Sequence, residues 1–354
     1  MGLSIPDDFN DDEILARIHS RLEHLARLYA SGKPLFPRHL LADLDAQIDQ
    51  GNEEVHIDDL DDVRHTYSLK VPAWCSDFAT TYRIGYSSIQ NLTCVHPSFP
   101  EISLRDTSPI SICYTSSAEY PEAPLPEVQA AFAASKRKWE ASETCAALKM
   151  HLTQLERKMA RPVRKIVAFG LGTLTGLENE FHSSRALAQH AALGSMVDVL
   201  AKRRLQSSPN QTPTPNDTTS STNAGIKVYV QDPAYTDVDI SLLHSLGITP
   251  LDDPKGFLEI DAETLVFSVS PNVPVKQVVA DVCWPAAMIW NTVMPEEKEN
   301  VRWEKQVRGG EEIWVVPFTT DPDSARVRRM VREYTSVPLR DSNEYFGDLT
   351  IYAR

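Results

Sequence analysis

The chain has 354 residues, of which 42% are hydrophobic and 24% charged, and its formal net charge is −14. This length allows one large domain or two ordinary ones, and the composition is that of a globular protein. No run approaches the roughly 20 apolar residues of a membrane-spanning helix, and the acidic N-terminus lacks the apolar core of a secretory signal, so we expect a cytoplasmic protein without a membrane partner. The five scattered cysteines contain no C-x-x-C pair and indicate neither a disulfide framework nor a thiolate zinc site.

Charge is unevenly distributed along the chain. Residues 1–70 contain 15 acidic and 7 basic residues, so more than half of the excess negative charge lies in the first fifth of the sequence. The remainder contains basic clusters at 136–138, 157–165, 201–205 and 326–332. Because positive charge is concentrated locally, the acidic total does not exclude a nucleic acid as partner.

The N-terminal part is predicted to be helical at first and irregular afterwards. Residues 11–31 place apolar side chains on one helical face, and a second short helix is predicted at 38–49. From about 65 to 122 the sequence is rich in Ser, Thr, Tyr and Pro, which is typical of short strands and loops. A long helix opened by prolines is predicted at 126–159.

Buried strands alternate with helices in the rest of the chain. The strands are apolar runs predicted at 165–170, 226–233, 264–270, 286–291, 313–318 and 348–354. The helices between them are predicted at 180–204, 237–246, 274–282 and 322–336, and a low-complexity insertion lies at 206–225. This alternation predicts a Rossmann-like α/β fold, with a mostly parallel sheet and helices on both faces. We therefore assign an acidic helical and irregular region to 1–122 and a Rossmann-like domain to 123–354.

The run KIVAFGLGTLTGLENEF at 165–181 places three glycines directly after the first of these strands. Gly170, Gly172 and Gly176 are spaced G-x-G-x-x-x-G, which differs from the dinucleotide fingerprint G-x-G-x-x-G. The run is either a cradle for an anion or an adenosine-bearing ligand, or only a tight turn between strand and helix. Asp232 ends the second strand, before a proline, where Rossmann-like sites carry the acidic residue that binds ribose.

Hydroxyl groups near the strand ends are candidate nucleophiles for acyl transfer. They are Thr173, Thr175, Ser183, Ser184, Ser268 and Ser270. No G-x-S-x-G elbow accompanies any of them, which argues against a hydrolase, and each is also compatible with helix capping or simple exposure. No histidines have the spacing of a metal site, so no metal ligand is predicted.

The basic clusters are either solvated surface or contacts to a phosphate backbone. The strongest local charge density lies in the predicted helix at 323–335, whose arginines spread around the helix. The candidate backbone contacts are Lys136, Arg137, Lys138, Arg203, Arg328 and Arg329. Spacing alone leaves both interpretations open.

Several motifs, taken in order, resemble the sensitivity-to-red-light-reduced (SRR)-like domain over residues 160–295. They are KIVAFGLGTLT, SSRALAQHAAL, VYVQDPAYTD and WPAAMIWN, with Gly170, Gly172, Arg185, Gln189, Asp232 and Pro233 at the matching motif positions. One departure follows the third strand, where plant and animal members carry Pro-His-Cys and this chain has SVSPNVP at 268–274. A role of that His and Cys therefore does not transfer to this chain.

The N-terminal extension, the insertion and the C-terminal tail look fungal, and the chain resembles the fungal arginine-containing cyclodipeptide synthases built on the same domain. This resemblance implies that arginine from arginyl-tRNA condenses with a second amino acid from another aminoacyl-tRNA. The product would be a 2,5-diketopiperazine of secondary metabolism, made without ATP or a cofactor. The glycine-rich loop would hold the aminoacyl-adenosine end, and the basic clusters would hold the tRNA.

The candidate site residues follow from the strand ends and from this resemblance. The candidate catalytic residues are Thr173, Asp232, Tyr235 and Ser270, and the candidate substrate-binding residues are Gly170, Gly172, Glu178, Arg185, Gln189 and Asn291. An acidic side chain would pair with the guanidinium of arginine, and Asp232, Glu178 and Glu180 are candidates for that role. The sequence defines neither the second amino acid nor the oligomeric state.

Two other functions remain open. An SRR-like protein without enzymatic activity would bind a ligand or a partner in light, clock or haem-related signalling. A methyltransferase-like enzyme would use the glycine loop for S-adenosylmethionine. An arginine-containing cyclic dipeptide as product would distinguish the synthase from both.

Overall fold

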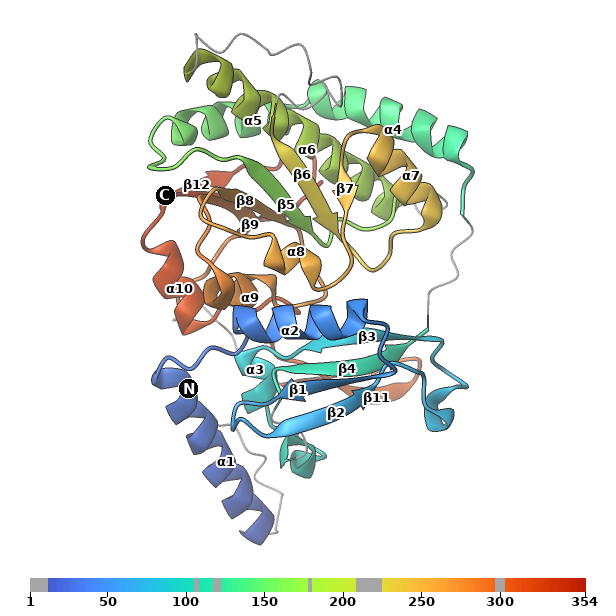
Figure 1. Cartoon of the computed structure of the whole chain (residues 1–354), viewed down its shortest axis with the longest axis vertical. Coiled ribbons are helices and arrows are strands. Elements are labelled where there is room, and N and C mark those ends of the chain that lie inside the picture. Colours follow the sequence, from blue (N-terminus) through green and yellow to red (C-terminus); the bar gives the residue numbers. More distant parts are fainter. Residues whose placement is uncertain (1–11, 105–107, 117–121, 178–179, 208–224, 297–302) are drawn as a thin grey trace. The chain divides into compact units, whose positions relative to one another are not determined.

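The computed structural model divides the chain into two compact units. It describes residues 12–104, 108–116, 122–177, 180–207, 225–296 and 303–354 (Figure 1). The first unit is built from the described residues of Met1–Ser117, Asn272–Val282 and Met294–Arg328, and the second from those of Ala118–Pro271, Cys283–Val293 and Arg329–Arg354. The first unit thus includes two segments from beyond residue 122, and the predicted domain boundary stays a prediction.

The described part of the first unit contains helices and three two-stranded antiparallel sheets. The helices are α1 (Asp12–Ala30), α2 (Arg38–Asp49), α3 (Ile89–Thr93) and α9 (Val275–Val282), with 3₁₀ turns at Ala73–Cys75 and Pro100–Leu104. The strand pairs are β1 (Glu54–Asp58) with β2 (Arg64–Ser68), β3 (Thr81–Tyr86) with β4 (Ile110–Thr115), and β10 (Glu304–Arg308) with β11 (Glu311–Val315). Ile18 and Leu22 of α1 are buried with Val95, as the apolar face of that helix predicts.

The second unit is organised around a seven-stranded sheet in the order β12-β13-β9-β8-β5-β6-β7. Its strands are β5 (Lys165–Phe169), β6 (Lys227–Gln231), β7 (Thr249–Pro250), β8 (Thr264–Ser268), β9 (Ala287–Asn291), β12 (Thr335–Leu339) and β13 (Leu349–Ala353). Strands β7, β6, β5, β8 and β9 run parallel, whereas β13 is antiparallel to β9 and β12 is antiparallel to β13. The predicted Rossmann-like fold with a mostly parallel sheet is therefore confirmed.

Helices cover both faces of this sheet (Figure 1). The helices of the second unit are α4 (Leu125–Glu140), α5 (Glu143–Glu156), α6 (Glu180–Ser207), α7 (Asp237–Ser245) and α8 (Lys255–Leu258), and α10 (Ala325–Val331) spans the boundary between the units. Ile166 and Ala168 of β5 are buried in one core with residues of α4, α5 and α6. Side chains alternate along a strand, so Phe169 points to the opposite face, where it stacks on Phe257 of α8 at 4.5 Å between ring centroids.

The prediction of one long helix at 126–159 is wrong, because the chain forms two helices there. Helix α4 ends at Glu140 and α5 begins at Glu143. Ser142 takes an extended conformation between them and accepts a hydrogen bond from the backbone N–H of Cys145 at 3.1 Å. A serine that caps a new helix in this way leaves the spacing of the apolar residues unchanged, so that spacing does not reveal where α4 ends and α5 begins.

Two C-terminal predictions are also corrected. The strand predicted at 313–318 is not part of the parallel sheet, because β11 pairs with β10 across a turn in which Gly309 and Gly310 both have positive φ. The helix predicted at 322–336 is shorter and is followed by β12, which the sequence pattern did not indicate. Strand β12 contains Pro338 and lies at an edge of the sheet, where a missing N–H is tolerated.

Candidate functional site

The candidate site lies in the second unit, at the edge of the sheet where the parallel strands end, which we call the carboxyl edge. The chain leaves β5 at Gly170, β6 at Asp232, β8 at Val269 and β9 at Thr292. Strand β13 runs the other way, with Leu349 opposite Asn291, so the segment 340–348 before it reaches the same edge. Ligands of open α/β sheets bind at this edge, next to the strands where the order reverses.

The glycine turn after β5 is shaped by close packing. Gly170 and Gly172 have φ of +68° and +79°, which favours glycine at both positions. A Cβ on Gly170 would lie 2.8 Å from the Cα of Pro271, so only glycine fits beside the loop that follows β8. The backbone N–H of Gly172 donates to Oδ2 of Asp232 at 2.7 Å. Close packing and a positive φ thus account for Gly170, and a positive φ alone accounts for Gly172, whose added Cβ would lie 3.7 Å from the Cβ of Ala186. The predicted role of both glycines in binding a ligand stays a prediction.

Two aspartates hold the turn from the β6 side. Asp232 is half-buried, and its Oδ1 also accepts the backbone N–H of Ala234 at 2.9 Å. Asp239 is fully buried; its Oδ2 accepts the Thr173 hydroxyl at 2.7 Å, and its Oδ1 accepts the N–H of Leu174 at 2.8 Å. Asp239 also forms a capping box with Thr236 at the start of α7. The sequence prediction omitted Asp239, although the T-D-V-D spacing is a capping signal.

A buried histidine pairs with the hydroxyl of Tyr235. Nδ1 of His190 lies 2.7 Å from the carbonyl oxygen of Ala186, which can only accept, so this nitrogen carries the proton. Nε2 is then unprotonated and accepts the Tyr235 hydroxyl at 2.8 Å. Burial lowers the pKa of His190, and burial together with the nearby charges of Asp232 and Asp239 raises the pKa of Tyr235, so both groups are neutral. His190 lies within the SSRALAQHAAL run, but the sequence prediction did not include it among the site residues.

Ser270 and Asn291 come together at the ends of β8 and β9. Ser270 is exposed and has a φ of +50°, a conformation that residues other than glycine rarely adopt. Its backbone N–H donates to Oδ1 of Asn291 at 3.2 Å. Two of the predicted site residues are therefore neighbours, one as a candidate nucleophile and the other as its support.

An open cavity of about 570 Å³, which we call the edge pocket, lies beside these strand ends. Its charged lining residues are Arg185, Arg340, Asp341, Glu344 and Asp348. Predicted site residues Arg185 and Gln189 contact this pocket's loop, because their side-chain nitrogens donate to the carbonyl oxygen of Tyr345 at 3.3 and 2.9 Å. The sequence prediction contained no residue from 340–348, because this segment has no motif.

The loop 340–348 is held by a buried anchor and by one carboxylate. Asp341 accepts the backbone N–H of Phe346 at 2.6 Å and that of Gly347 at 3.1 Å through Oδ2, and that of Asn343 at 3.3 Å through Oδ1. The Phe346 ring is buried, 5.4 Å from the ring of Trp139. The shape of the edge pocket therefore follows from packing and backbone hydrogen bonds.

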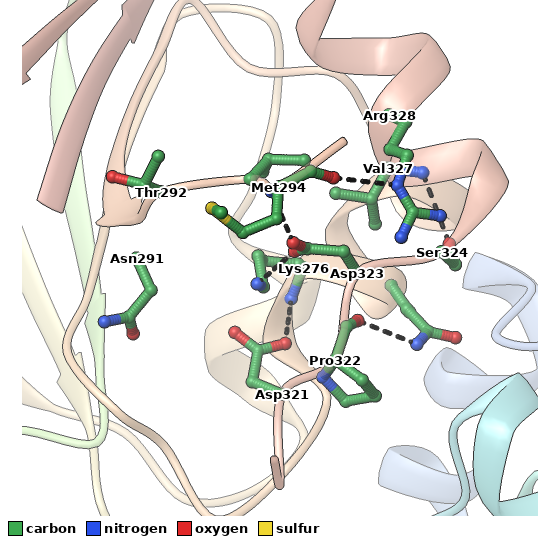
Figure 2. Close-up of polar contacts among 12 residues, drawn as sticks. Lys276, Asn291, Thr292, Met294, Asp321, Pro322, Asp323, Ser324, Val327 and Arg328 are labelled. Carbon is green, nitrogen blue, oxygen red and sulfur yellow. Dashed lines mark hydrogen bonds and ion pairs between the residues drawn. The ribbon is translucent and has the colours of Figure 1, made fainter. Parts of the chain in front are cut away.

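The predicted tRNA contacts lie on different elements. Lys136, Arg137 and Lys138 are exposed on α4, which packs on α7 beside the β7 edge of the sheet. Arg329 is exposed on α10, which leads into β12 at the other edge, and Arg328 is half-buried with its Nε donating to the carbonyl of Met294 at 2.9 Å (Figure 2). Glu178 and the side chains of Glu180 and Arg203 lie outside the described residues. Nucleic-acid binding by these clusters stays a prediction.

The first unit contains a separate cluster of buried charges, which we call the lysine–aspartate cluster (Lys276, Asp321 and Asp323; Figure 2). The Lys276 ammonium forms an ion pair with Oδ1 of Asp323, whose Oδ2 accepts the backbone N–H of Met294 at 2.7 Å. Asp321 accepts the backbone N–H of Lys276 at 3.0 Å through Oδ1, while its buried Oδ2 has no hydrogen-bond partner among the residues that the structure describes. Burial raises the pKa of Asp321 to about 7. The sequence prediction contained none of these residues.

Comparison with known proteins gives one match. The sequence pattern described as the SRR1 domain matches residues 146–353, which is more than half of the chain. No curated protein and no solved structure matches the chain significantly. None of the described helices has the length and apolar character needed to cross a bilayer, and no three metal-binding side chains of the described residues converge on one point.

Proposed function

The chain belongs to the SRR1 domain family, and on this premise we propose that it is a tRNA-dependent cyclodipeptide synthase of the fungal arginine-containing type. It would take arginine and a second amino acid from their aminoacyl-tRNAs and release a 2,5-diketopiperazine. The family alone does not decide between this activity and a regulatory role without catalysis. The proposal therefore depends on the chemistry available at the carboxyl edge.

The observation that carries the proposal is the hydrogen bond from the Tyr235 hydroxyl to the unprotonated Nε2 of His190 at 2.8 Å. A neutral imidazole that accepts from a hydroxyl is a proton acceptor coupled to a proton donor, as general acid–base catalysis requires. The Ala186 carbonyl fixes the imidazole, and the backbone N–H of Tyr235 donates to the carbonyl oxygen of Asp232 at 3.3 Å, just after the end of β6. We therefore assign proton transfer in the proposed reaction to this pair.

The proposed reaction needs only proton transfer and alignment from the protein. The α-amino nitrogen of one aminoacyl group attacks the ester carbonyl of the other, an amide bond forms, and the ester C–O bond breaks. Tyr235 passes a proton to His190 as it takes one from the attacking amine, and the proton then returns to the departing 3′-hydroxyl of the tRNA. A second step of the same kind closes the ring and releases the second tRNA. Because both ester bonds are already activated, no ATP is consumed.

Two hydroxyls remain candidates for an acyl-enzyme step. Thr173 donates its hydroxyl to Oδ2 of Asp239 at 2.7 Å, which would assist its deprotonation. Ser270 is exposed beside Asn291. Either hydroxyl would take the first aminoacyl group from its tRNA before the amine of the second attacks.

Expression of the full chain in a heterologous host, followed by mass spectrometry of the culture, tests this proposal. We expect a new arginine-containing cyclic dipeptide. Tyr235→Phe should lower its formation by about 10²–10⁴-fold, because the hydroxyl that contacts His190 is lost. Tyr229→Phe removes a hydroxyl from β6 in the same unit and serves as the control, with formation unchanged. A folded wild-type chain that yields no such product would contradict the proposal and favour a regulatory role.

A further inference from the structure

The edge pocket offers two carboxylates for a ligand. Asp341 is not one of them, because both of its oxygens accept backbone N–H groups of its own loop. Glu344 is exposed, and within the described part of the chain it forms no hydrogen bond or ion pair. Asp348 is also exposed, and the Thr292 hydroxyl donates to its Oδ1 at 2.9 Å, which orients the carboxylate and leaves Oδ2 available.

The remaining charged lining of the pocket is positive. Arg340 is exposed, and Arg185 is oriented by its hydrogen bond to the Tyr345 carbonyl at 3.3 Å. A cavity of about 570 Å³ is in the range of small-ligand sites. Carboxylates and guanidinium groups in one lining suit a ligand that carries a cation at one end and an anionic group at the other.

We propose that Glu344 and Asp348 form the subsite that receives the guanidinium group of the arginyl substrate. The identification of the ligand as an arginyl group rests on the proposed function, whereas the choice of these two carboxylates rests on the pocket. A planar guanidinium has five N–H donors and bridges two carboxylates better than a compact ammonium does. Arg185 and Arg340 then disfavour the reverse orientation and face the phosphate-bearing end of the substrate.

Calorimetric titration of the full chain with agmatine, which carries a guanidinium but no carboxylate, tests the subsite. We expect agmatine to bind more tightly than butylamine, and the double variant Glu344→Gln, Asp348→Asn to bind it at least about tenfold more weakly. The control is Glu127→Gln, Asp198→Asn, which removes the same charge from exposed positions on α4 and α6. Thermal denaturation of each variant checks that it is folded, as expected for exposed side chains.

Product analysis of the same variants separates this inference from the proposed function. If only the Glu344 and Asp348 variant loses both agmatine binding and the arginine-containing product, the result supports the guanidinium subsite and the synthase proposal. If agmatine binding depends on the two carboxylates but no chain makes a cyclic dipeptide, the subsite stands and the synthase proposal fails. If wild type does not bind agmatine, or if the variant binds it equally well, the subsite is overturned, whatever the wild-type product.

Discussion

The edge pocket and the lysine–aspartate cluster use charged side chains in opposite ways. Glu344 and Arg340 of the edge pocket are exposed, whereas no side chain of the lysine–aspartate cluster is more than 7% exposed. Burial makes each charge of the cluster dependent on its partners, because a lone charge in a dry interior is very costly. Exposed charges contribute little to stability and are free to serve a ligand. Mutations in the two regions should therefore affect different properties.

The largest stability effect is expected for Lys276→Met. The substitution leaves Asp323 buried without its ion-pair partner, so the free energy of unfolding should fall by about 3–5 kcal/mol. The control is Lys305→Met, which breaks an exposed ion pair with Glu312 and should cost less than about 1 kcal/mol. Urea denaturation measures the free energy of unfolding of both variants. Equal decreases in the two would contradict the distinction between the buried and the exposed ion pair.

Asp321 is expected to make the free energy of unfolding depend on pH. Burial raises its pKa to about 7, although the Lys276 charge lowers it and the Asp323 charge raises it. The folded state therefore binds this proton more tightly than the unfolded state, whose pKa is near 3.8. Stability from this group is fully present below about pH 4 and is lost as the pH rises to about 7.

Urea denaturation from pH 5 to 8 checks this expectation. Asp321→Asn keeps an oxygen that accepts the Lys276 N–H, but its side chain cannot ionise. Between pH 5 and pH 8 the free energy of unfolding should therefore fall less in the variant than in the wild type, and the difference should be on the order of a few kcal/mol. Parallel pH profiles of the two chains would show that Asp321 titrates in its ordinary range.

A smaller effect on the free energy of unfolding is expected from a substitution in the glycine turn after β5. Gly170→Ala puts a Cβ against Pro271 at a positive φ, so it should destabilise the chain by about 1–3 kcal/mol. Gly194 is exposed within α6, with nothing near its added Cβ, and Gly194→Ala should stabilise by about 0.5–1 kcal/mol. Opposite signs in thermal denaturation are the expected result. A neutral Gly170→Ala would show that the turn tolerates a side chain, and the cradle interpretation would then gain weight.

The sequence predicted the sheet better than the site. The strands at 165–170, 226–233, 264–270 and 286–291 are continuous apolar runs, which mark buried parallel strands directly. The ends of these strands place Asp232 and Asn291 at the carboxyl edge, as the sequence predicted for the strand ends. The turn-forming Asp239 was missed only because its capping signal was not used.

Other features depend on contacts that no local pattern records. His190 is 45 residues from Tyr235 in the sequence, and only the fold brings the two side chains together. Lys276 and Asp323 are far apart in the sequence, so their ion pair arises only in the folded chain. Strand β12 and the loop 340–348 lack periodicity, and the edge pocket was therefore not predicted.

The reversed direction of β13 has a consequence for how the pocket could diversify. A parallel strand in that place would bring its preceding loop to the opposite edge of the sheet. Because β13 is antiparallel, 340–348 is a hairpin connection whose ends, Leu339 and Leu349, are paired neighbours. Insertions or exchanges in such a connection leave the parallel strands unchanged. Related chains could thus change the lining of the edge pocket by altering one short, late segment while keeping the His190–Tyr235 hydrogen bond intact.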